Sequence, residues 1–109
     1  MSNVTNKHCV PCEGGVAPLT RAEAEAYLAN LSGWSLNENA TAITKTVTRK
    51  DFAGALMLVN AIGEIAENEG HHPDVSIHNY NSVTITLSTH SIGGLSENDF
   101  IMAAKIEEV

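Results

Sequence analysis

Apolar residues recur every three or four positions in three stretches of the chain, which predicts three amphipathic helices. The first helix is expected over residues 20–30, where Thr20 and Glu23 have the spacing of an N-terminal capping box. Ser96 and Asp99 repeat this spacing ahead of the third stretch, which continues nearly to the C-terminus. Both helices therefore carry a start signal that satisfies backbone amide donors locally.

The middle stretch is the longest and predicts a helix of about five turns. Asp51 precedes it and is placed to cap its N-terminus. Gly70 suits the left-handed residue that ends a helix, and Pro73 prevents the helix from resuming. The stripe expected to face the core consists of Phe52, Leu56, Val59, Ile62, Ile65 and Ala66.

Between the helices, alternating apolar and polar residues predict two β-hairpins, one over residues 34–48 and one over residues 75–87. Short turns make the paired strands antiparallel, and amphipathic helices must cover one face of the sheet. We therefore expect an α+β fold of order α-β-β-α-β-β-α, with three helices packed on one face of a four-stranded antiparallel sheet. The open face is predicted to carry a polar row from the last strand, consisting of Thr84, Thr86, Ser88 and His90.

The composition bounds the class of protein. The chain has 109 residues, of which 43% are hydrophobic, and this suits one domain with a modest core. Its net charge of −7 comes from 13 acids and 6 bases without a run of Lys or Arg, so direct nucleic-acid binding is not expected. The N-terminus lacks the features of a signal or transit peptide, and no long apolar segment predicts a membrane span. We therefore expect a soluble, cytoplasmic protein.

Two cysteines, Cys9 and Cys12, lie in a predicted N-terminal tail over residues 1–18, ahead of a single domain over residues 19–109. Their spacing is compatible with a thioredoxin-like site, which should follow a strand and open a helix. Haem attachment requires a histidine after the second cysteine, where the chain has Glu13, and a closed zinc site requires two more ligands, of which His8 could be one. A free or loosely metal-binding tail is the simplest interpretation.

Histidines are the main candidates for chemistry. His71 and His72 are adjacent, directly before Pro73, and His90 ends the last predicted strand. Neighbouring side chains in an extended segment point in different directions, so the pair need not chelate a metal and could move protons on one bound molecule. A site for Zn²⁺ or Fe²⁺ that also uses His78 is the alternative, but the chain has neither His-x-His nor His-Glu-x-x-His spacing. Otherwise His78 is expected on the surface.

The order of these residues is familiar. Glu67-x-x-x-His71-His72-Pro73, followed by an aromatic residue, the stretch Leu-Ser-Thr-His at 87–90 and Asp99, closely resembles the signature of pterin-4a-carbinolamine dehydratases over roughly residues 20–107. One difference is that six residues separate Pro73 from the aromatic Tyr80, whereas the family usually has five. A β-bulge in the third strand is expected to absorb the additional residue.

The resemblance implies a reaction. Such enzymes eliminate water from 4a-hydroxytetrahydropterin, the carbinolamine that an aromatic amino-acid hydroxylase leaves behind, and return quinonoid dihydropterin to tetrahydrobiopterin recycling. The elimination moves only protons, so neither a metal nor an organic cofactor is implied. By position, the catalytic residues are His71, His72 and His90.

The resemblance also implies a substrate-binding set around these histidines. Its members are Gly70, Pro73, Ser88, Thr89, Glu67, Asp99 and Trp34. Glu67, one helical turn before His71, and Asp99 are expected to accept hydrogen bonds from imidazoles, although Asp99 has a sufficient role as a helix cap. Trp34 is either an aromatic wall of the pocket or a core residue.

Relatives in this family form dimers and dimers of dimers, and some animal members also dimerise a homeodomain transcription factor. We expect a homodimer or homotetramer here, and the last strand, if uncovered, is a ready edge for pairing with a second copy. A transcription-factor partner has no sequence feature for or against it.

Overall fold

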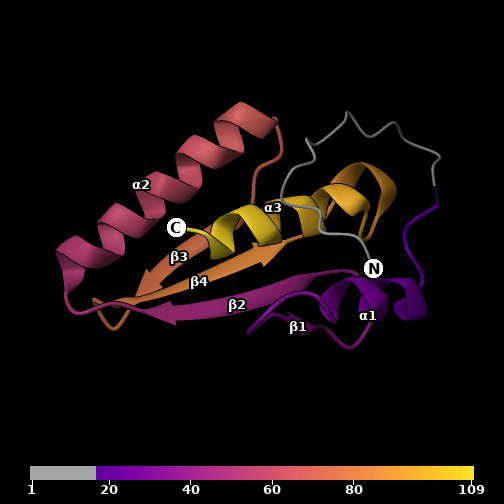
Figure 1. Ribbon diagram of the computed structural model, residues 1–109, viewed down its shortest axis with the longest axis horizontal. Helices are drawn as coiled ribbons and strands as arrows, with labels where there is room; N and C mark the ends of the chain where they lie inside the picture. Colours follow the sequence, from indigo (N-terminus) through magenta and orange to yellow (C-terminus); the bar gives the residue numbers. More distant parts are fainter. Residues whose placement is uncertain (1–16) are drawn as a thin grey trace.

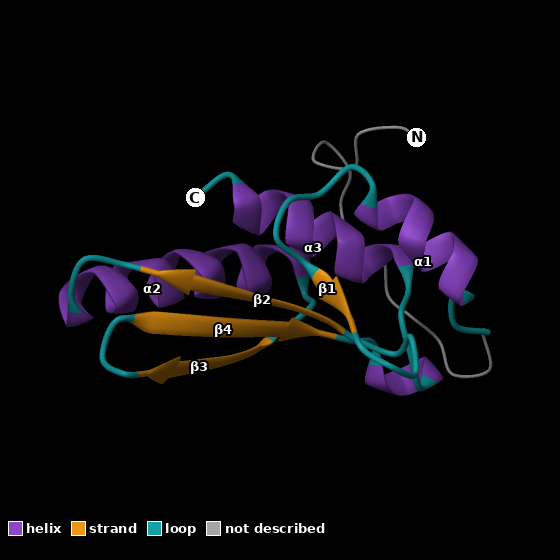
Figure 2. Cartoon of the chain, turned by 90° about the horizontal axis from the view of Figure 1, so that it is seen from below, coloured by secondary structure: helices purple, strands orange, loops and turns teal. Residues whose placement is uncertain are grey.

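Three helices lie on one side of a four-stranded antiparallel sheet in the computed structural model, which describes residues 17–109 (Figures 1 and 2). The α+β class and the order of elements are confirmed, with one additional 3-10 turn before the last helix. The elements are α1 (Arg21–Leu28), β1 (Ser35–Leu36), β2 (Ile43–Thr48), α2 (Phe52–Glu69), β3 (Asp74–His78), β4 (Ser82–Leu87), η1 (His90–Ile92) and α3 (Glu97–Glu107). Within the described part of the chain, no helix is long and apolar enough to cross a membrane.

The strands follow the order β1-β2-β4-β3, so the last strand is central. The prediction that it forms an open edge is therefore wrong, because β4 pairs with β2 on one side and with β3 on the other. The predicted bulge in β3 is also wrong, since β3 pairs with β4 without interruption from Asp74↔Thr86 to His78↔Ser82. Tyr80 lies in the turn between these two strands, where it and Asn79 have positive φ angles.

The helix ends follow their predicted chemistry. Thr20 and Glu23 form a capping box at α1, and Asp51 caps α2 by accepting a 2.8 Å hydrogen bond from the Gly54 N–H. Ser96 and Asp99 form the capping box of α3. These contacts are local in sequence, which is why the sequence alone identified them.

The core lies between β4 and the two longer helices, α2 and α3. Val83, Ile85 and Leu87 are fully buried on β4, as their alternation predicts. The predicted stripe of α2 is correct for Ile62 and Ala66, which are buried, and wrong for Phe52 and Leu56, which are 52% and 42% exposed. The buried face begins with Ala55 and Leu58 instead. The face that α2 turns to the core therefore differs from the predicted stripe, which was chosen by the size of the apolar side chains.

The opposite face of the sheet carries a hydroxyl row formed by threonines of β2 and β4. It includes Thr84 and Thr86 of the predicted polar row, whereas Ser88 and His90 lie beyond the end of β4. Thr44 and Thr86 face each other across β2 and β4 with their hydroxyl oxygens 3.3 Å apart, and Thr46 and Thr84 do so at 3.1 Å. His78 lies on the same face, where its Nε2 is 2.6 Å from the Thr84 hydroxyl. Such cross-strand pairs hold the register without burying apolar area.

Candidate active site

The end of α2 positions the adjacent histidines. Gly70 is left-handed, with φ 66° and ψ 26°, and its N–H donates to the Ala66 carbonyl at 2.9 Å. The chain reverses at this residue, as only a glycine does without strain. His71 and His72 therefore occupy a short connection between a long helix and strand β3, which begins at Asp74.

The loop after β4 positions the third histidine. The Thr89 N–H donates to the Gly94 carbonyl at 2.8 Å, which closes the loop, and His90 begins the turn η1 inside it. A Cβ on Gly94 would lie only 2.7 Å from the Cβ of Pro18, so this position has no room for a side chain. The glycine thus lets the N-terminal segment pack closely against the loop that carries His90.

The three histidines line one pocket. Its volume is about 270 Å³, and its lining residues are Gly70, His71, His72, Ser88, Thr89, His90 and Ser91. The predicted catalytic residues are thus brought together from two loops separated by a hairpin. Ser91 was absent from the predicted set, and apart from its place beside His90 the sequence contains no signal for it.

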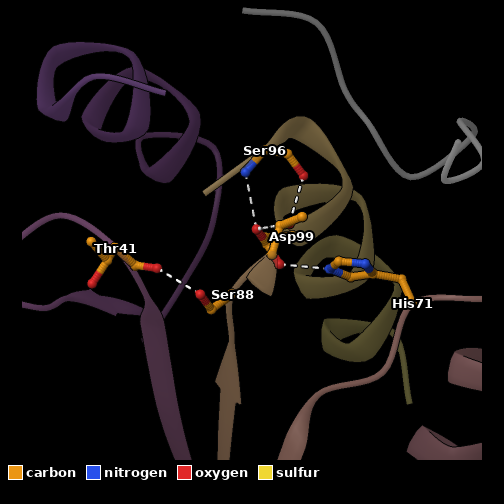
Figure 3. Close-up of polar contacts among 6 residues, drawn as sticks. Thr41, His71, Ser88, Ser96 and Asp99 are labelled. Carbon is orange, nitrogen blue, oxygen red and sulfur yellow. Dashed lines mark hydrogen bonds and ion pairs between the residues drawn. The ribbon is translucent and has the colours of Figure 1, made fainter. Parts of the chain in front are cut away.

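His71 is paired with a buried carboxylate (Figure 3). Its Nε2 lies 2.6 Å from the Oδ1 of Asp99, and the two side chains are 13% and 0% exposed. The other carboxylate oxygen, Oδ2, accepts the backbone N–H of Ser96 at 3.0 Å. Asp99 therefore has both roles anticipated from the sequence, because it caps α3 and holds an imidazole.

His72 is paired with an exposed carboxylate. Its Nε2 lies 2.5 Å from the Oε2 of Glu67, and these side chains are 62% and 77% exposed. The helical spacing had placed Glu67 beside His71, but the reversal at Gly70 turns His71 toward α3 and leaves Glu67 to His72. The expectation that Glu67 accepts a hydrogen bond from an imidazole agrees with this contact.

His90 differs from the other two. Its side chain is exposed, and among residues 17–109 it has no hydrogen-bond or ion-pair partner. The pocket thus contains two imidazoles oriented by carboxylates and one that is free to meet a ligand.

The remaining predicted residues lie in the pocket lining, in a neighbouring groove or, for Trp34, in the core. Gly70, Ser88 and Thr89 line the pocket, and the Ser88 hydroxyl donates to the Thr41 carbonyl at 2.9 Å (Figure 3). Pro73 and Glu67 line a neighbouring apolar groove that shares only His72 with the pocket.

Trp34 does not line the pocket. It is 8% exposed and belongs to the hydrophobic core, with Lys45 Nζ 6.0 Å from its ring centroid. The core interpretation of Trp34 therefore agrees with the structure, and the pocket lining gives the substrate-binding interpretation no support. A lone tryptophan at the start of a strand gave no means of distinguishing the two from sequence.

The acid–base groups have no obvious metal-binding geometry. Within the described residues, no group of three His, Cys, Asp or Glu side chains is arranged to hold a metal ion. His78, which a four-histidine metal site would need, points to the hydroxyl row rather than to the pocket. Cys9 and Cys12 lie outside the described residues. What the pocket offers chemically is the delivery and removal of protons.

Comparison with known proteins agrees with this chemistry. The family model described as pterin 4 alpha carbinolamine dehydratase matches residues 17–109. A protein from Methylococcus capsulatus, named as a candidate pterin-4-alpha-carbinolamine dehydratase, is 44% identical over 98% of this chain and 93% of its own. A relative of the same name from Halorhodospira halophila is 45% identical over 96% of this chain and 95% of its own.

Solved structures give the same result. A protein described as a transcriptional coactivator/pterin dehydratase from Brucella melitensis is 36% identical, with a TM-score of 0.77 over 84% of this chain and 96% of its own. A pterin dehydratase-like protein described as a RuBisCO assembly factor shares the fold, with a TM-score of 0.59, but is only 19% identical. The matched span, the identities and the shared fold agree: the chain belongs to the pterin-4a-carbinolamine dehydratase family.

Proposed function

We propose that this protein is a 4a-hydroxytetrahydropterin dehydratase that works by histidine acid–base catalysis. The observation that carries the proposal is the convergence of His71, His72 and His90 on one pocket of about 270 Å³. Family membership supplies the reaction class, and the pocket supplies groups that suit it.

The reaction needs one acid and one base. In the carbinolamine, the C4a–O bond breaks and the hydroxyl leaves as water after it gains a proton. N5 loses its hydrogen, and the electron pair of that N–H bond forms the C4a=N5 double bond of the quinonoid dihydropterin. One proton is given and one is taken, so no net charge, oxidant or reductant enters the balance. Imidazole, with an ordinary pKa of about 6.5, can perform either transfer near neutral pH.

The imidazoles occupy suitable positions for these two transfers. His71 and His72 come from the loop after α2, whereas His90 comes from the loop after β4. We place the pterin ring between these loops, with acid and base acting from opposite sides and the backbone of Gly70, Ser88 and Thr89 bounding the ring. Asp99 holds His71 in a fixed tautomer, as carboxylates do for catalytic imidazoles, whereas the exposed Glu67 offers His72 a hydrogen-bond acceptor.

The biological setting follows from the substrate. The carbinolamine is the product of pterin-dependent aromatic hydroxylation, so an aromatic amino-acid hydroxylase must supply it and tetrahydrobiopterin recycling must use the product. We further propose a cytoplasmic location and a homodimer or homotetramer. Because β4 is central, any strand pairing between copies would use the outer strands β3 or β1.

Stopped-flow measurement of dehydration with freshly generated carbinolamine tests the proposal. Each of His71→Ala, His72→Ala and His90→Ala should reduce the catalysed rate by roughly 10²–10⁴-fold while the fold survives. His78→Ala is the matched control, because it removes an imidazole from the open sheet face and should leave the rate unchanged. Wild-type rates in all three pocket variants would refute the assignment.

A second function is suggested by the Brucella structure, whose description includes transcriptional coactivator. We propose it only as an additional protein-binding role that does not use the histidine pocket. The test is a pull-down from an extract of the native organism with wild-type and His90→Ala proteins as bait. Capture of the same DNA-binding protein by both baits would support this role. Capture by neither protein would contradict this second function.

A further inference from the structure

We infer that Thr89 is a positioning residue that fixes His71 through Asp99. The inference rests on the side-chain hydrogen bonds that link two lining residues, Thr89 and His71, through the buried Asp99. Its structural part is independent of the proposed reaction, and its effect on turnover rests on the proposed function.

The Thr89 hydroxyl donates to the Oδ2 of Asp99 at 2.8 Å, on the carboxylate oxygen that His71 does not use. Thr89 is 4% exposed and Asp99 is 0% exposed, so water does not compete for this hydrogen bond. The Oγ of Ser96 lies 2.8 Å from the same Thr89 hydroxyl oxygen. A hydroxyl has one hydrogen, and that of Thr89 is committed to Asp99, so Ser96 must be the donor in this contact.

In this chain of hydrogen bonds, each donor leads toward the carboxylate of Asp99. Ser96 donates to Thr89, Thr89 donates to Asp99, and the Ser96 N–H provides a second donor to the same oxygen at 3.0 Å. An ionised carboxylate is only an acceptor, so the remaining oxygen, Oδ1, must accept from the Nε2–H of His71. The Nδ1 of His71 then has no hydrogen in the neutral ring and is the nitrogen that can take a proton.

The first turn of α3 strengthens this arrangement. Asp99 lies in that turn, where the free N–H groups and the helix dipole favour negative charge. Two neutral donors and a helix N-terminus therefore face this carboxylate inside the protein, where a buried charge needs such partners. Without the Thr89 hydroxyl, the Oδ2 of Asp99 has one hydrogen-bond donor fewer.

The experiment compares Thr89→Val with Thr89→Ser. Valine keeps the shape and removes the hydroxyl, whereas serine restores it. In ¹⁵N spectra of the imidazoles, wild-type and Thr89→Ser proteins should show neutral His71 in the single Nε2–H form, and Thr89→Val should show a mixture of the two tautomers. Dehydration by Thr89→Val should lose roughly 10- to 100-fold in kcat with little change in KM, the usual worth of a hydrogen bond to a charged group.

Thr46→Val is the control, since it removes an exposed hydroxyl from β2 and should change neither the spectra nor kcat. A single unchanged His71 tautomer in Thr89→Val overturns the inference, as does a serine variant that behaves like the valine variant. Because the spectra need no substrate, the tautomer result stands even if the wild-type protein fails to dehydrate the carbinolamine. That failure would refute the proposed function alone.

Discussion

Two of the pocket's imidazoles are paired with carboxylates, at nearly equal distances and in opposite surroundings. His71 and Asp99 are 2.6 Å apart and almost entirely buried, whereas His72 and Glu67 are 2.5 Å apart and mostly exposed. Water and salt weaken the second pair, and the low dielectric of the interior strengthens the first. Equal distances therefore do not mean equal energies.

The pairs also differ in what supports the carboxylate. The carboxylate of Asp99 accepts hydrogen bonds from the Thr89 hydroxyl and from the backbone N–H of Ser96, which together fix its position. Glu67 projects from an exposed position near the end of α2 and is free to change rotamer. We expect the buried pair to fix geometry and the exposed pair to adapt to substrate.

Among variants that keep all three pocket histidines, the largest effect is expected for Asp99→Asn. The variant loses the charge that orients His71, and its amide can hold the wrong tautomer of the ring, so the dehydration rate should fall about 10²-fold. The free energy of unfolding should fall by about 3 kcal/mol, because a buried pair is broken and a helix cap is weakened. Stopped-flow dehydration and urea unfolding measure both. Near-wild-type values for both would mean that burial gives this pair no advantage.

Gly94→Ala should be next. Its Cβ would lie 2.7 Å from Pro18, so the loop from Thr89 to Gly94 must move. That loop supplies the Thr89 hydroxyl to the buried pair, whereas the exposed pair is built on α2 and the residues after it. Unfolding free energy should fall by about 2 kcal/mol, within the range for strained or overpacked substitutions. Gly63→Ala, at a position with open space around the added methyl, is the matched control and should not destabilise the protein.

Glu67→Gln should have a much smaller effect than Asp99→Asn. An exposed ion pair contributes less than about 1 kcal/mol, so stability should change by no more than that. The dehydration rate should fall less than about tenfold, because His72 keeps a hydrogen-bond partner in the glutamine oxygen. A rate loss as large as that of Asp99→Asn would show that exposure does not diminish this pair.

Salt should separate the pairs directly. At about 1 M salt the screening length is about 3 Å, which suppresses interactions between exposed charges. Double-mutant cycles measure the coupling free energy of each pair at low and at high salt. The coupling between His72 and Glu67 should disappear at high salt, whereas the coupling between His71 and Asp99 should remain. Equal salt sensitivity of the two couplings would contradict the comparison.

The smallest effect is expected at a third carboxylate contact, outside the pocket. Burial, and then the 2.9 Å hydrogen bond to Glu97, raise the pKa of Tyr27 above its ordinary value of 10.0. Because the pKa of Tyr27 is higher in the folded than in the unfolded protein, its protonated hydroxyl contributes to the free energy of unfolding. This contribution is complete below the unfolded pKa of about 10 and is lost as the pH rises through the folded pKa. The stability difference between wild type and Tyr27→Phe should therefore shrink above pH 10. Tyr80→Phe, at the exposed tyrosine, is the control.

Much of the fold was predictable because its signals are local. The capping residues Thr20, Asp51 and Ser96 act on amides within three residues, and the alternation of Val83, Ile85 and Leu87 needs only the pleat of one strand. The stripe of α2 was misjudged at Phe52 and Leu56. Large apolar side chains do not define the buried face of a helix on which a small residue such as Ala55 is fully buried.

The sequence predicted most of the residues at the candidate site, but not which carboxylate contacts which imidazole. Three histidines, Glu67 and Asp99 were assigned to the site by resemblance to the family signature, but Glu67 was expected beside His71 and contacts His72. Thr89 was expected only to bound the pocket, although its hydroxyl supports Asp99. Trp34 was drawn into the site by resemblance and belongs to the core.

The sequence by itself determined the helices, the strands, their caps and the identity of the groups that can move protons. The tertiary structure alone decided which strand is central and which carboxylate meets which imidazole. The reason is physical: caps and periodicity depend on neighbours along the chain, whereas His71 meets Asp99 across 28 positions. That contact exists only because a left-handed Gly70 reverses the chain and α3 packs where it does.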